Sequence, residues 1–498
     1  MHPSTSQATR VPLTPGFNPR HGWYWLYIGL VTGLLFVAFY SWHYDDPFIT
    51  YRYADNLAHG LGFVYNEGER VLSTTTPLFA ILLAILSHFW GDLPHLANLI
   101  GAFSLAVGGV FFWQLAGSWA VPAVGWAGLF LYPTSPLLLT TLGSEMPLFL
   151  AFCLGSFALY ARRSFVLAAA FAGLATLTRP DGLLVVFLLV ADYLIKERGR
   201  PPWKAALLFL GLTLPWVVFA WSYFGSPLPA TLAAKQHQGS MLISPPFATR
   251  LPVILSSYAS HWYYWLAALL AVAGVGAMVV RYRRWALFIL WPVAHFAVYT
   301  ALGVSGYYWY YAPLVPGFIA CLGLGIALTE APLKHAGGQT ESWLTWTRRC
   351  FVLLPVLLIA VLAAGQLSSL WHLRRQPDSR YLIYRAIGEW LQGHTPPAAR
   401  VGTLEAGIIG YNTSRSMVDF AGLIQPQVAA QLKPSSTYAD AALFAVQAYR
   451  PQYLVLLDGM FPELEGDYVS QSCQVSRHFK GKDYGFSGDL TIYTCEAQ

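Results

Sequence analysis

A short polar stretch holds the residues of this sequence that are best suited to chemistry. Asp45 and Asp46 are adjacent and are followed by Arg52 and Tyr53. A carboxylate can accept the proton of a hydroxyl group, and a cation can stabilise a departing phosphate. This combination suits displacement at a carbon that carries a phosphate leaving group. The alternative is a solvated loop in which the two acids only mark the edge of an apolar segment.

Further charged residues interrupt the apolar runs of the chain. Glu145 precedes one such run, and Arg179 and Asp181 separate two short apolar segments. Charges inside an apolar hairpin are costly unless they pair or line a cavity. We therefore weigh a structural contact between Arg179 and Asp181 against a cavity wall that faces a phosphate. Lys235, with His237 close by, is either a solvated loop lysine or a phosphate contact.

An uninterrupted aromatic run extends from Tyr307 to Tyr311 and includes Tyr310. Rings at a membrane surface form either an interfacial belt or a wall that faces a sugar or a lipid. We include Tyr310 and Tyr311 among the candidate residues that bind a donor or an acceptor.

The composition shows which elements must position these residues. The chain has 498 residues, of which 56% are hydrophobic and 11% charged, against about 25% charged in an average soluble protein. The mean hydropathy is +0.47. Several stretches reach the roughly 17–25 apolar residues that a membrane-spanning helix needs. The sequence therefore predicts an α-helical polytopic membrane protein. The net charge of +6 is too small to indicate a nucleic-acid partner.

Basic residues beside apolar segments predict the orientation in the membrane, because loops rich in Lys and Arg stay in the cytoplasm. These residues are Arg10 and Arg20, Arg162 and Arg163, Lys196–Lys204, Arg281–Arg284, and Arg348 and Arg349. Trp23–Tyr40 is longer than the core of a signal peptide and predicts a first span from the cytoplasm outward. Pro77–Trp90 is short and is predicted to be interfacial or re-entrant. We expect about eleven spans, with the acidic pair and the C-terminus outside.

The chain divides into two predicted domains. Residues 1–374 form the membrane domain, with a first external loop at 42–76, and residues 375–498 form a small external α/β domain. Its predicted elements are the helices Tyr381–Leu391 and Ala439–Tyr449 and the strands Ala399–Leu404, Gln452–Leu457 and Leu490–Cys495. Five cysteines are too few for a disulfide framework, but Cys473 and Cys495 can form one bridge if this domain is outside the cytoplasm.

Several segments resemble bacterial GT-C glycosyltransferases, a superfamily that includes mycobacterial terminal arabinofuranosyltransferases. The sequence Asp-Asp-Pro-Phe-Ile-Thr-Tyr-Arg-Tyr-Ala-Asp-Asn-Leu, which begins at Asp45, resembles the first external loop of these enzymes. The double Asp motif is weak by itself, but the further segments follow in the same order over most of the chain. They are residues 62–70, 143–150, 177–182, 224–235, 309–314, 404–411 and 418–423.

The resemblance implies an inverting glycosyltransferase in the bacterial cytoplasmic membrane. Such an enzyme moves a sugar, arabinofuranose or another pentose or hexose, from a polyprenyl-phosphate donor to a cell-envelope glycan, lipid or protein at the outer face. It implies that Asp45 or Asp46 is the base, that Glu145 contacts donor or acceptor, and that Arg179 and Lys235 bind the donor phosphate. Members of the superfamily differ in whether a divalent metal is used, and no metal ligands are predicted here. Pro47 and the Ser-Thr-Thr-Thr run depart from relatives, which leaves the sugar open.

Two other functions fit parts of the pattern. A transporter or flippase of a lipid-linked sugar also has many spans and charges within the membrane, but it more often has two similar halves. No such repeat is found in this sequence. A non-catalytic glycan-binding membrane protein is the other alternative, and it predicts that Asp45 and Asp46 can be replaced without consequence.

Overall fold

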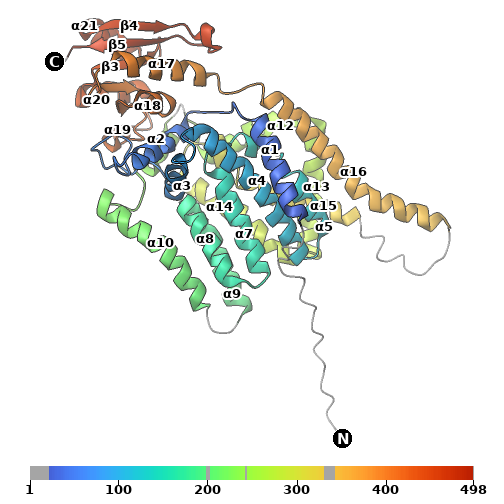
Figure 1. Cartoon of the computed structure of the whole chain (residues 1–498). Coiled ribbons are helices and arrows are strands. Elements are labelled where there is room, and N and C mark those ends of the chain that lie inside the picture. The colour runs from blue at the N-terminus through green and yellow to red at the C-terminus, as the bar shows by residue number, and fades with distance from the viewer. Residues whose placement is uncertain (1–21, 198–201, 242–243, 330–341, 497–498) are drawn as a thin grey trace.

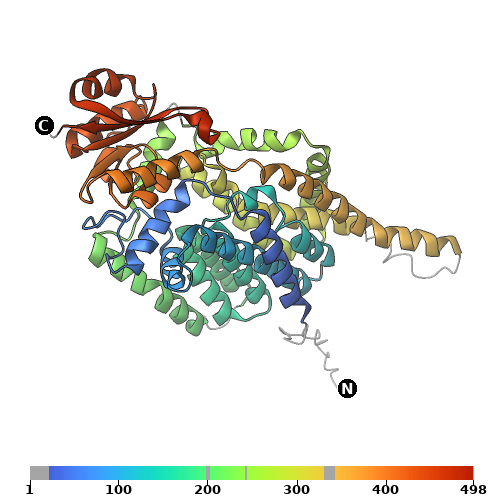
Figure 2. The same cartoon turned by 45° about the horizontal axis from the view of Figure 1, so that its top comes forward.

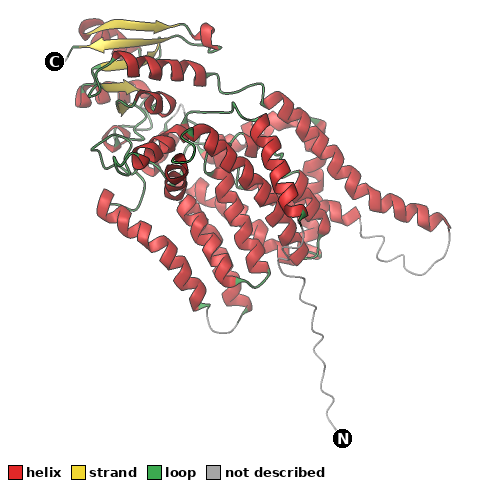
Figure 3. Ribbon diagram, viewed as in Figure 1, coloured by secondary structure: helices red, strands yellow, loops and turns green. Residues whose placement is uncertain are grey.

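The protein consists of a helical part and a smaller domain with a β-sheet (Figures 1 and 3). A computed structural model describes residues 22–197, 202–241, 244–329 and 342–496. Some of the basic residues that predict the orientation lie outside the described residues. These are Arg10, Arg20, part of Lys196–Lys204, and the side chains of Arg348 and Arg349.

The helical part is a bundle of apolar helices with short connections. Its longer helices are α1 (Trp23–Ala38), α4 (Leu93–Ser118), α5 (Pro122–Phe130), α7 (Met146–Ala161), α8 (Phe165–Thr178), α9 (Leu183–Lys196), α10 (Trp203–Phe224), α13 (Trp262–Val280), α14 (Ala286–Leu302), α15 (Leu314–Ala327) and α16 (Ser342–Leu373). Short turns are α6 (Pro136–Leu139), η1 (Pro180–Gly182), η2 (Arg283–Trp285) and η3 (Tyr308–Tyr311). Among the described residues, six helical segments are long and apolar enough to cross a membrane. The predicted class, a multi-pass α-helical membrane protein, is confirmed, whereas the number of about eleven spans stays a prediction.

Prolines explain where the helices differ from the apolar runs. The sequence also predicts Val121–Leu139 as one apolar run, and the structure divides it between α5 and α6. Pro133 lies between the two helices and Pro136 begins α6, and proline both lacks an N–H and disfavours a helical residue before it. The prediction of one continuous run is therefore wrong.

Helix α3 (Pro77–Ser87) has 11 residues. At 1.5 Å per residue it extends for roughly 16 Å, about half of the hydrocarbon thickness of a bilayer. This length agrees with the expectation that the segment does not cross the membrane by itself.

The first external loop lies between the helical part and the sheet domain (Figures 1 and 2). Its helix α2 (Asp46–Ala58) begins with a proline in the first turn and is buried over most of its length. Phe48 and Tyr51 belong to one hydrophobic cluster with Ile383, Ile387 and Ile408 of the sheet domain. The two parts of the chain therefore share a core around α2.

Two further helices lie in the connection between α10 and α13. They are α11 (Ala230–Ser240) and α12 (Phe247–Ala259). Lys235 is a buried residue of helix α11. The backbone N–H of Ser305, two residues before the aromatic run, donates a hydrogen bond to the carbonyl oxygen of Lys235. This arrangement places a lysine from the middle of the sequence beside the N-terminus of α2.

The sheet domain has five strands in the order β2-β1-β3-β5-β4. The strands are β1 (Arg400–Thr403), β2 (Ser416–Asp419), β3 (Tyr453–Leu457), β4 (Cys473–Phe479) and β5 (Leu490–Cys495). The helical segments are α17 (Arg380–His394), α18 (Gly407–Thr413), α19 (Pro426–Ala429), α20 (Tyr438–Tyr449), α21 (Ser470–Ser472), η5 (Leu464–Val469) and η6 (Gly481–Tyr484). Strand β1 pairs in parallel with β2 and β3, whereas β5 pairs antiparallel with β3 and β4.

The predicted strands and helices of this domain are confirmed as β1, β3, β5, α17 and α20, within two or three residues at each end. Strands β2 and β4 were not predicted. Strand β2 has only four residues, and β4 is an edge strand whose residues are mostly exposed, so neither carries a strong hydrophobic pattern. A disulfide joins Cys473 and Cys495, the two cysteines that the sequence singled out.

Candidate active site

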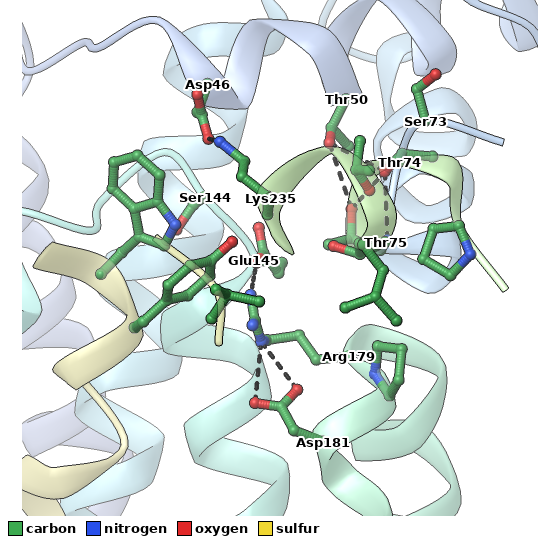
Figure 4. A pocket seen from close by; sticks show the side chains of 18 of the residues that line it. Asp46, Thr50, Ser73, Thr74, Thr75, Ser144, Glu145, Arg179, Asp181 and Lys235 are labelled. Atoms are coloured by element: carbon green, nitrogen blue, oxygen red, sulfur yellow. Dashed lines mark hydrogen bonds and ion pairs between the residues drawn. The ribbon is translucent and has the colours of Figure 1, made fainter. Parts of the chain in front are cut away.

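A cavity of about 380 Å³ opens where α2, α11 and the segment between α8 and α9 meet (Figure 4). Six of the residues predicted from the sequence line it, although they come from five distant parts of the chain. They are Asp46, Glu145, Arg179, Asp181, Lys235 and Tyr310. We call this the first cavity.

Acidic and basic side chains alternate along the first cavity. Figure 4 shows them from Asp46 at the top through Lys235, Glu145 and Arg179 to Asp181 at the bottom. In the lower part, Arg179 Nη1 lies 2.6 Å from Glu145 Oε1, and Arg179 Nε lies 3.1 Å from Asp181 Oδ1. The guanidinium is thus held by two carboxylates. Arg179 and Asp181 contact each other and also line a cavity, whereas a phosphate ligand in that cavity stays a prediction.

The local sequence explains how Arg179 reaches this position. Helix α8 ends at Thr178, and Arg179 has an extended backbone because Pro180 follows it. Its side chain is only 7% exposed and also donates a hydrogen bond from Nη2 to the hydroxyl of Tyr299, at 2.7 Å. A buried arginine with three partners of this kind has a fixed geometry.

Lys235 lies in the upper part of the first cavity. Its Nζ is 3.7 Å from Asp46 Oδ2 and 3.8 Å from the centre of the Tyr307 ring, which is a cation–π contact. Burial by itself lowers the pKa of Lys235, but the charge of Asp46 and the neighbouring phenol groups raise it, so the pKa lies above its usual value. Lys235 is therefore a buried cation beside an aspartate.

Three threonine hydroxyls form the opposite wall, and Figure 4 labels two of these residues, Thr50 and Thr74. The Oγ1 atoms of Thr50 and Thr74 are 3.2 Å apart, and Thr76 Oγ1 lies 3.3 Å from Thr50 and 3.0 Å from Thr74. The sequence Thr74-Thr75-Thr76-Pro77 predicts the start of a helix, and α3 does begin at Pro77. Thr76 makes no side-chain capping bond, however, and its hydroxyl joins the cavity wall instead. The signal for this wall in the sequence was a group of hydroxyl residues inside the predicted first external loop.

A second cavity of about 300 Å³ lies between the helical part and the sheet domain. Asp46 and Lys235 line both cavities. The sheet domain contributes charged residues that the sequence had not singled out. They are Asp378, Arg380 and Glu405. Glu405 lies inside one of the segments that carry the family resemblance, which is the signal that would have found it.

The three charged residues from the sheet domain form a chain of ion pairs. Arg380 Nη2 lies 2.7 Å from Asp378 Oδ2, and Arg380 Nη1 lies 3.1 Å from Glu405 Oε1. Burial raises the pKa of Glu405, whereas the charge of Arg380 lowers it, and the net shift is upward.

Asp45 and Asp46 have different environments. Asp45 is only 6% exposed, and its two carboxylate oxygens accept the N–H groups of Gly407, at 3.1 Å, and Ile408, at 2.7 Å. Burial and the nearby charge of Glu405 raise the pKa of Asp45 well above its usual range, although the N–H of Ile408 acts in the opposite direction. The Asp46 side chain is 36% exposed and faces both cavities. Asp45 therefore binds helix α18, while Asp46 is accessible to a ligand.

Arg52 also joins the first external loop to the sheet domain. Its guanidinium donates hydrogen bonds to the carbonyl oxygens of Tyr65, at 2.8 Å, Gly410, at 2.6 Å, and Arg415, at 2.5 Å. It also lies over the ring of Tyr65, 4.4 Å from its centre. Arg52 is not among the residues that line either cavity.

Three more of the predicted binding residues lie outside the lining of both cavities. The hydroxyl of Tyr53 donates to the carbonyl oxygen of Val71 at 2.5 Å, and that of Tyr311 donates to the carbonyl oxygen of Phe247. His237 is half-buried on α11.

Neither cavity contains a cluster with the geometry of a metal site among the described residues. The group that brings three potential ligand atoms within 4.8 Å of one another is Asp458, His478 and Asp489, all exposed. None of these three residues lines either cavity.

Comparison with known sequences finds two partial matches. Residues 372–493 match a family model described as a domain of unknown function (DUF8728). The chain is also 29% identical to a terminal beta-(1->2)-arabinofuranosyltransferase of Mycobacterium tuberculosis over 43% of its own length. The match spans only 40% of the length of that curated relative.

Comparison with solved structures covers almost the whole chain. ArnT from Cupriavidus metallidurans bound to undecaprenyl phosphate is 18% identical, with a TM-score of 0.58 over 96% of this chain and 99% of ArnT. The apo state of ArnT gives 17% identity and a TM-score of 0.60, over 97% and 100% of the two chains. The Archaeoglobus fulgidus oligosaccharyltransferase in complex with Zn and sulfate gives 12% identity and a TM-score of 0.51, over 89% and 69%. This protein is therefore a multi-pass membrane protein with the GT-C fold.

Proposed function

We propose that this protein is an inverting glycosyltransferase that transfers a sugar from a polyprenyl-phosphate donor to a hydroxyl group of an acceptor. The observation that carries the proposal is the position of Asp46 in the walls of both cavities, beside Lys235. A single accessible carboxylate between two cavities suits a reaction in which two substrates meet at one proton acceptor.

The first cavity suits the donor. Lys235 and Arg179 supply positive charge for a phosphate, and the threonine hydroxyls supply hydrogen-bond donors. Apolar residues on the same cavity provide a surface for a prenyl chain, among them Leu183 and Leu228, which are 39% and 66% exposed. The fold shared with ArnT, which was solved with undecaprenyl phosphate, supports this assignment.

The chemical step is a single displacement. The acceptor oxygen attacks the anomeric carbon of the donor sugar, and its proton passes to the carboxylate of Asp46. The bond between the anomeric carbon and the phosphate oxygen breaks, and its electron pair stays on that oxygen to give polyprenyl phosphate. Lys235 stabilises the negative charge of the leaving phosphate. Because attack and departure occur on opposite faces, the configuration at the anomeric carbon inverts.

Asp46 is the better candidate for the base because Asp45 is already engaged. Both oxygens of Asp45 accept backbone N–H groups of α18, and a base needs a free lone pair within reach of the acceptor hydroxyl. Asp45 then acts by holding the start of α2.

We place the reaction at the outer face of the bacterial cytoplasmic membrane. The basic clusters predict cytoplasmic loops on the side opposite the first external loop. The disulfide between Cys473 and Cys495 fits an oxidising compartment for the sheet domain. The similarity to the mycobacterial arabinofuranosyltransferase supports arabinofuranose as the transferred sugar. Another pentose or a hexose is the alternative.

The test is turnover of a panel of polyprenyl-phosphate pentoses and hexoses by the purified protein in detergent, read as release of polyprenyl phosphate. We expect one donor to be consumed, with a new glycosidic bond of inverted configuration. Binding of polyprenyl phosphate serves as the check that the protein is folded. If the folded protein binds this lipid and consumes none of the donors, the proposed function is wrong.

A further inference from the structure

The second cavity has one wall from the helical part and one from the sheet domain. The residues from the sheet domain are Asp378, Arg380, Leu404, Glu405, Ala406, Ala421, Leu423 and Tyr438. All of them lie within residues 372–493, the segment described as a domain of unknown function. The domain therefore contributes directly to the space next to Asp46.

The charges around the second cavity argue against an anionic ligand. The charged lining residues are four acids and three cations: Asp45, Asp46, Asp378, Glu405, Lys235, Arg250 and Arg380. Arg380 is already bound by Asp378 and Glu405, and Lys235 faces Asp46. Arg250 is the remaining cation, and it is exposed. A cavity without surplus positive charge gives little stabilisation to a phosphate or carboxylate of an acceptor.

The aromatic residues of the same cavity fit a sugar ring. Tyr307 and Trp309 stack with their ring centres 4.6 Å apart at an angle of 16°, and Lys235 Nζ lies over the Tyr307 ring. Tyr438 of the sheet domain lines the same cavity, within hydrogen-bonding reach of Tyr307. The hydroxyl of Tyr307 donates to Gln238 Oε1 at 3.1 Å, which fixes an amide in the cavity wall. Flat apolar faces together with carboxylates and amides match the apolar faces and hydroxyl groups of a carbohydrate.

We propose that the sheet domain is the acceptor-binding wall of the active site and that the acceptor end is a neutral sugar. Glu405 accepts a hydrogen bond from a hydroxyl of this sugar, Arg380 holds Glu405 in place, and Tyr438 packs against the ring. This inference rests on the proposed function, because it needs Asp46 as the shared base. It assigns a role to a domain that the proposed reaction by itself does not require.

The first test is the variant Glu405→Gln. Its rate is measured once as a function of donor concentration and once as a function of acceptor concentration. The acceptors are octyl glycosides of neutral pentoses and hexoses. Loss of a hydrogen bond to a charged group weakens binding by about tenfold to a hundredfold, so the KM for the acceptor should rise by that factor. The KM for the donor should stay within about twofold, because the first cavity does not include Glu405.

Two controls keep this test specific. Glu389→Gln removes an exposed acid of the same domain that pairs with Arg385 and lines neither cavity, so it should behave as the wild type. Glu405→Asp keeps the charge and should restore part of the acceptor affinity. If Glu405→Gln is folded and its KM for the acceptor equals that of the wild type, the inference is overturned.

The second test compares neutral and anionic acceptors on the wild type. We expect octyl glucoside and its neutral relatives to stimulate release of polyprenyl phosphate more than octyl glucuronide does. Stimulation by the glucuronide alone, or by none of the glycosides, would overturn the neutral-sugar assignment. Failure of the proposed function is a different result, since the wild type would then consume no donor under any condition.

Discussion

At the scale of single residues, Asp45 and Asp46 show how two neighbouring acids can divide their roles. The carboxylate of Asp45 is satisfied by two backbone N–H groups, whereas that of Asp46 has an ion-pair partner at 3.7 Å and stays partly exposed. The sequence identified the pair but could not separate its members, because the partners of Asp45 lie more than 360 residues later in the chain. Contacts over such separations leave no local pattern.

Lys235 gives a prediction at this scale. The variant Lys235→Gln should bind polyprenyl phosphate about tenfold to a hundredfold more weakly, because it removes a charged donor from the first cavity. Affinity is measured by titration of the purified protein with the lipid. Lys433→Gln, which changes an exposed lysine of the sheet domain, is the matched control. Equal affinity in Lys235→Gln and the wild type would remove Lys235 from the donor site.

Asp419 gives a prediction about pH. This residue is fully buried at the end of β2, and burial raises its pKa to about 7, although N–H groups of Ala421 and Leu423 act to lower it. An unfolded aspartate has a pKa of about 3.9, so between roughly pH 4 and 7 only the folded state keeps the proton. The resulting stabilisation is complete below about pH 4 and is lost as the pH rises through 7.

The measurement is the melting temperature of wild type and Asp419→Asn from pH 4 to pH 8. We expect the melting temperature of the wild type to fall relative to that of the variant as the pH rises. The total change should correspond to at most about 4 kcal/mol in the free energy of unfolding. A difference that does not change with pH would contradict the raised pKa.

At the scale of elements, the position of α2 depends on α18. Helix α18 packs against α2 and α17, and it places the N–H groups of Gly407 and Ile408 on Asp45. A methyl group at Gly407 would overlap with the carbonyl oxygen and the carboxylate of Asp45, so only glycine allows this close approach. Since Asp46 is the next residue, the same contact fixes the proposed base.

The variant Gly407→Ala should therefore lower kcat on the order of a hundredfold, the effect expected from a shift of about 1 Å in a catalytic group. The KM for the donor should change little, because Lys235 and Arg179 do not contact Gly407. Gly393→Ala in α17 has open space around the added methyl group and serves as the control. A Gly407→Ala protein that is stable and has the kcat of the control would show that α18 does not position the base.

Elements with a strong apolar pattern could be predicted closely. The predicted strand Leu490–Cys495 coincides with β5, and the predicted helix Ala439–Tyr449 differs from α20 by one residue. The predictions failed where local chemistry overrides the pattern, as at the prolines between α5 and α6, or where the pattern is weak, as in the exposed strand β4. The residues of the second cavity were missed for another reason, because they become neighbours of Asp46 only through the docking of the sheet domain.

At the scale of the whole molecule, the sheet domain lies at one end of the helical bundle (Figure 1), and Asp46, at the start of α2, lines both cavities. The basic cluster Arg281–Arg284 follows α13 and is predicted to face the cytoplasm. A cysteine introduced as Lys433→Cys should react with a membrane-impermeant maleimide in intact cells, whereas one introduced as Arg284→Cys should react only after permeabilisation. Each is compared with the labelling of the wild type. The reverse pattern would place the sheet domain in the cytoplasm and contradict the proposed orientation.

The central claim is that Asp46 is the base at the junction of the two cavities. The most direct measurement is release of polyprenyl phosphate by Asp46→Asn, with Asp55→Asn as a control on the same helix. We predict that Asp46→Asn keeps its fold and its affinity for polyprenyl phosphate but loses at least about a hundredfold in rate, while Asp55→Asn keeps the wild-type rate. A folded Asp46→Asn protein with the rate of the wild type would contradict the account.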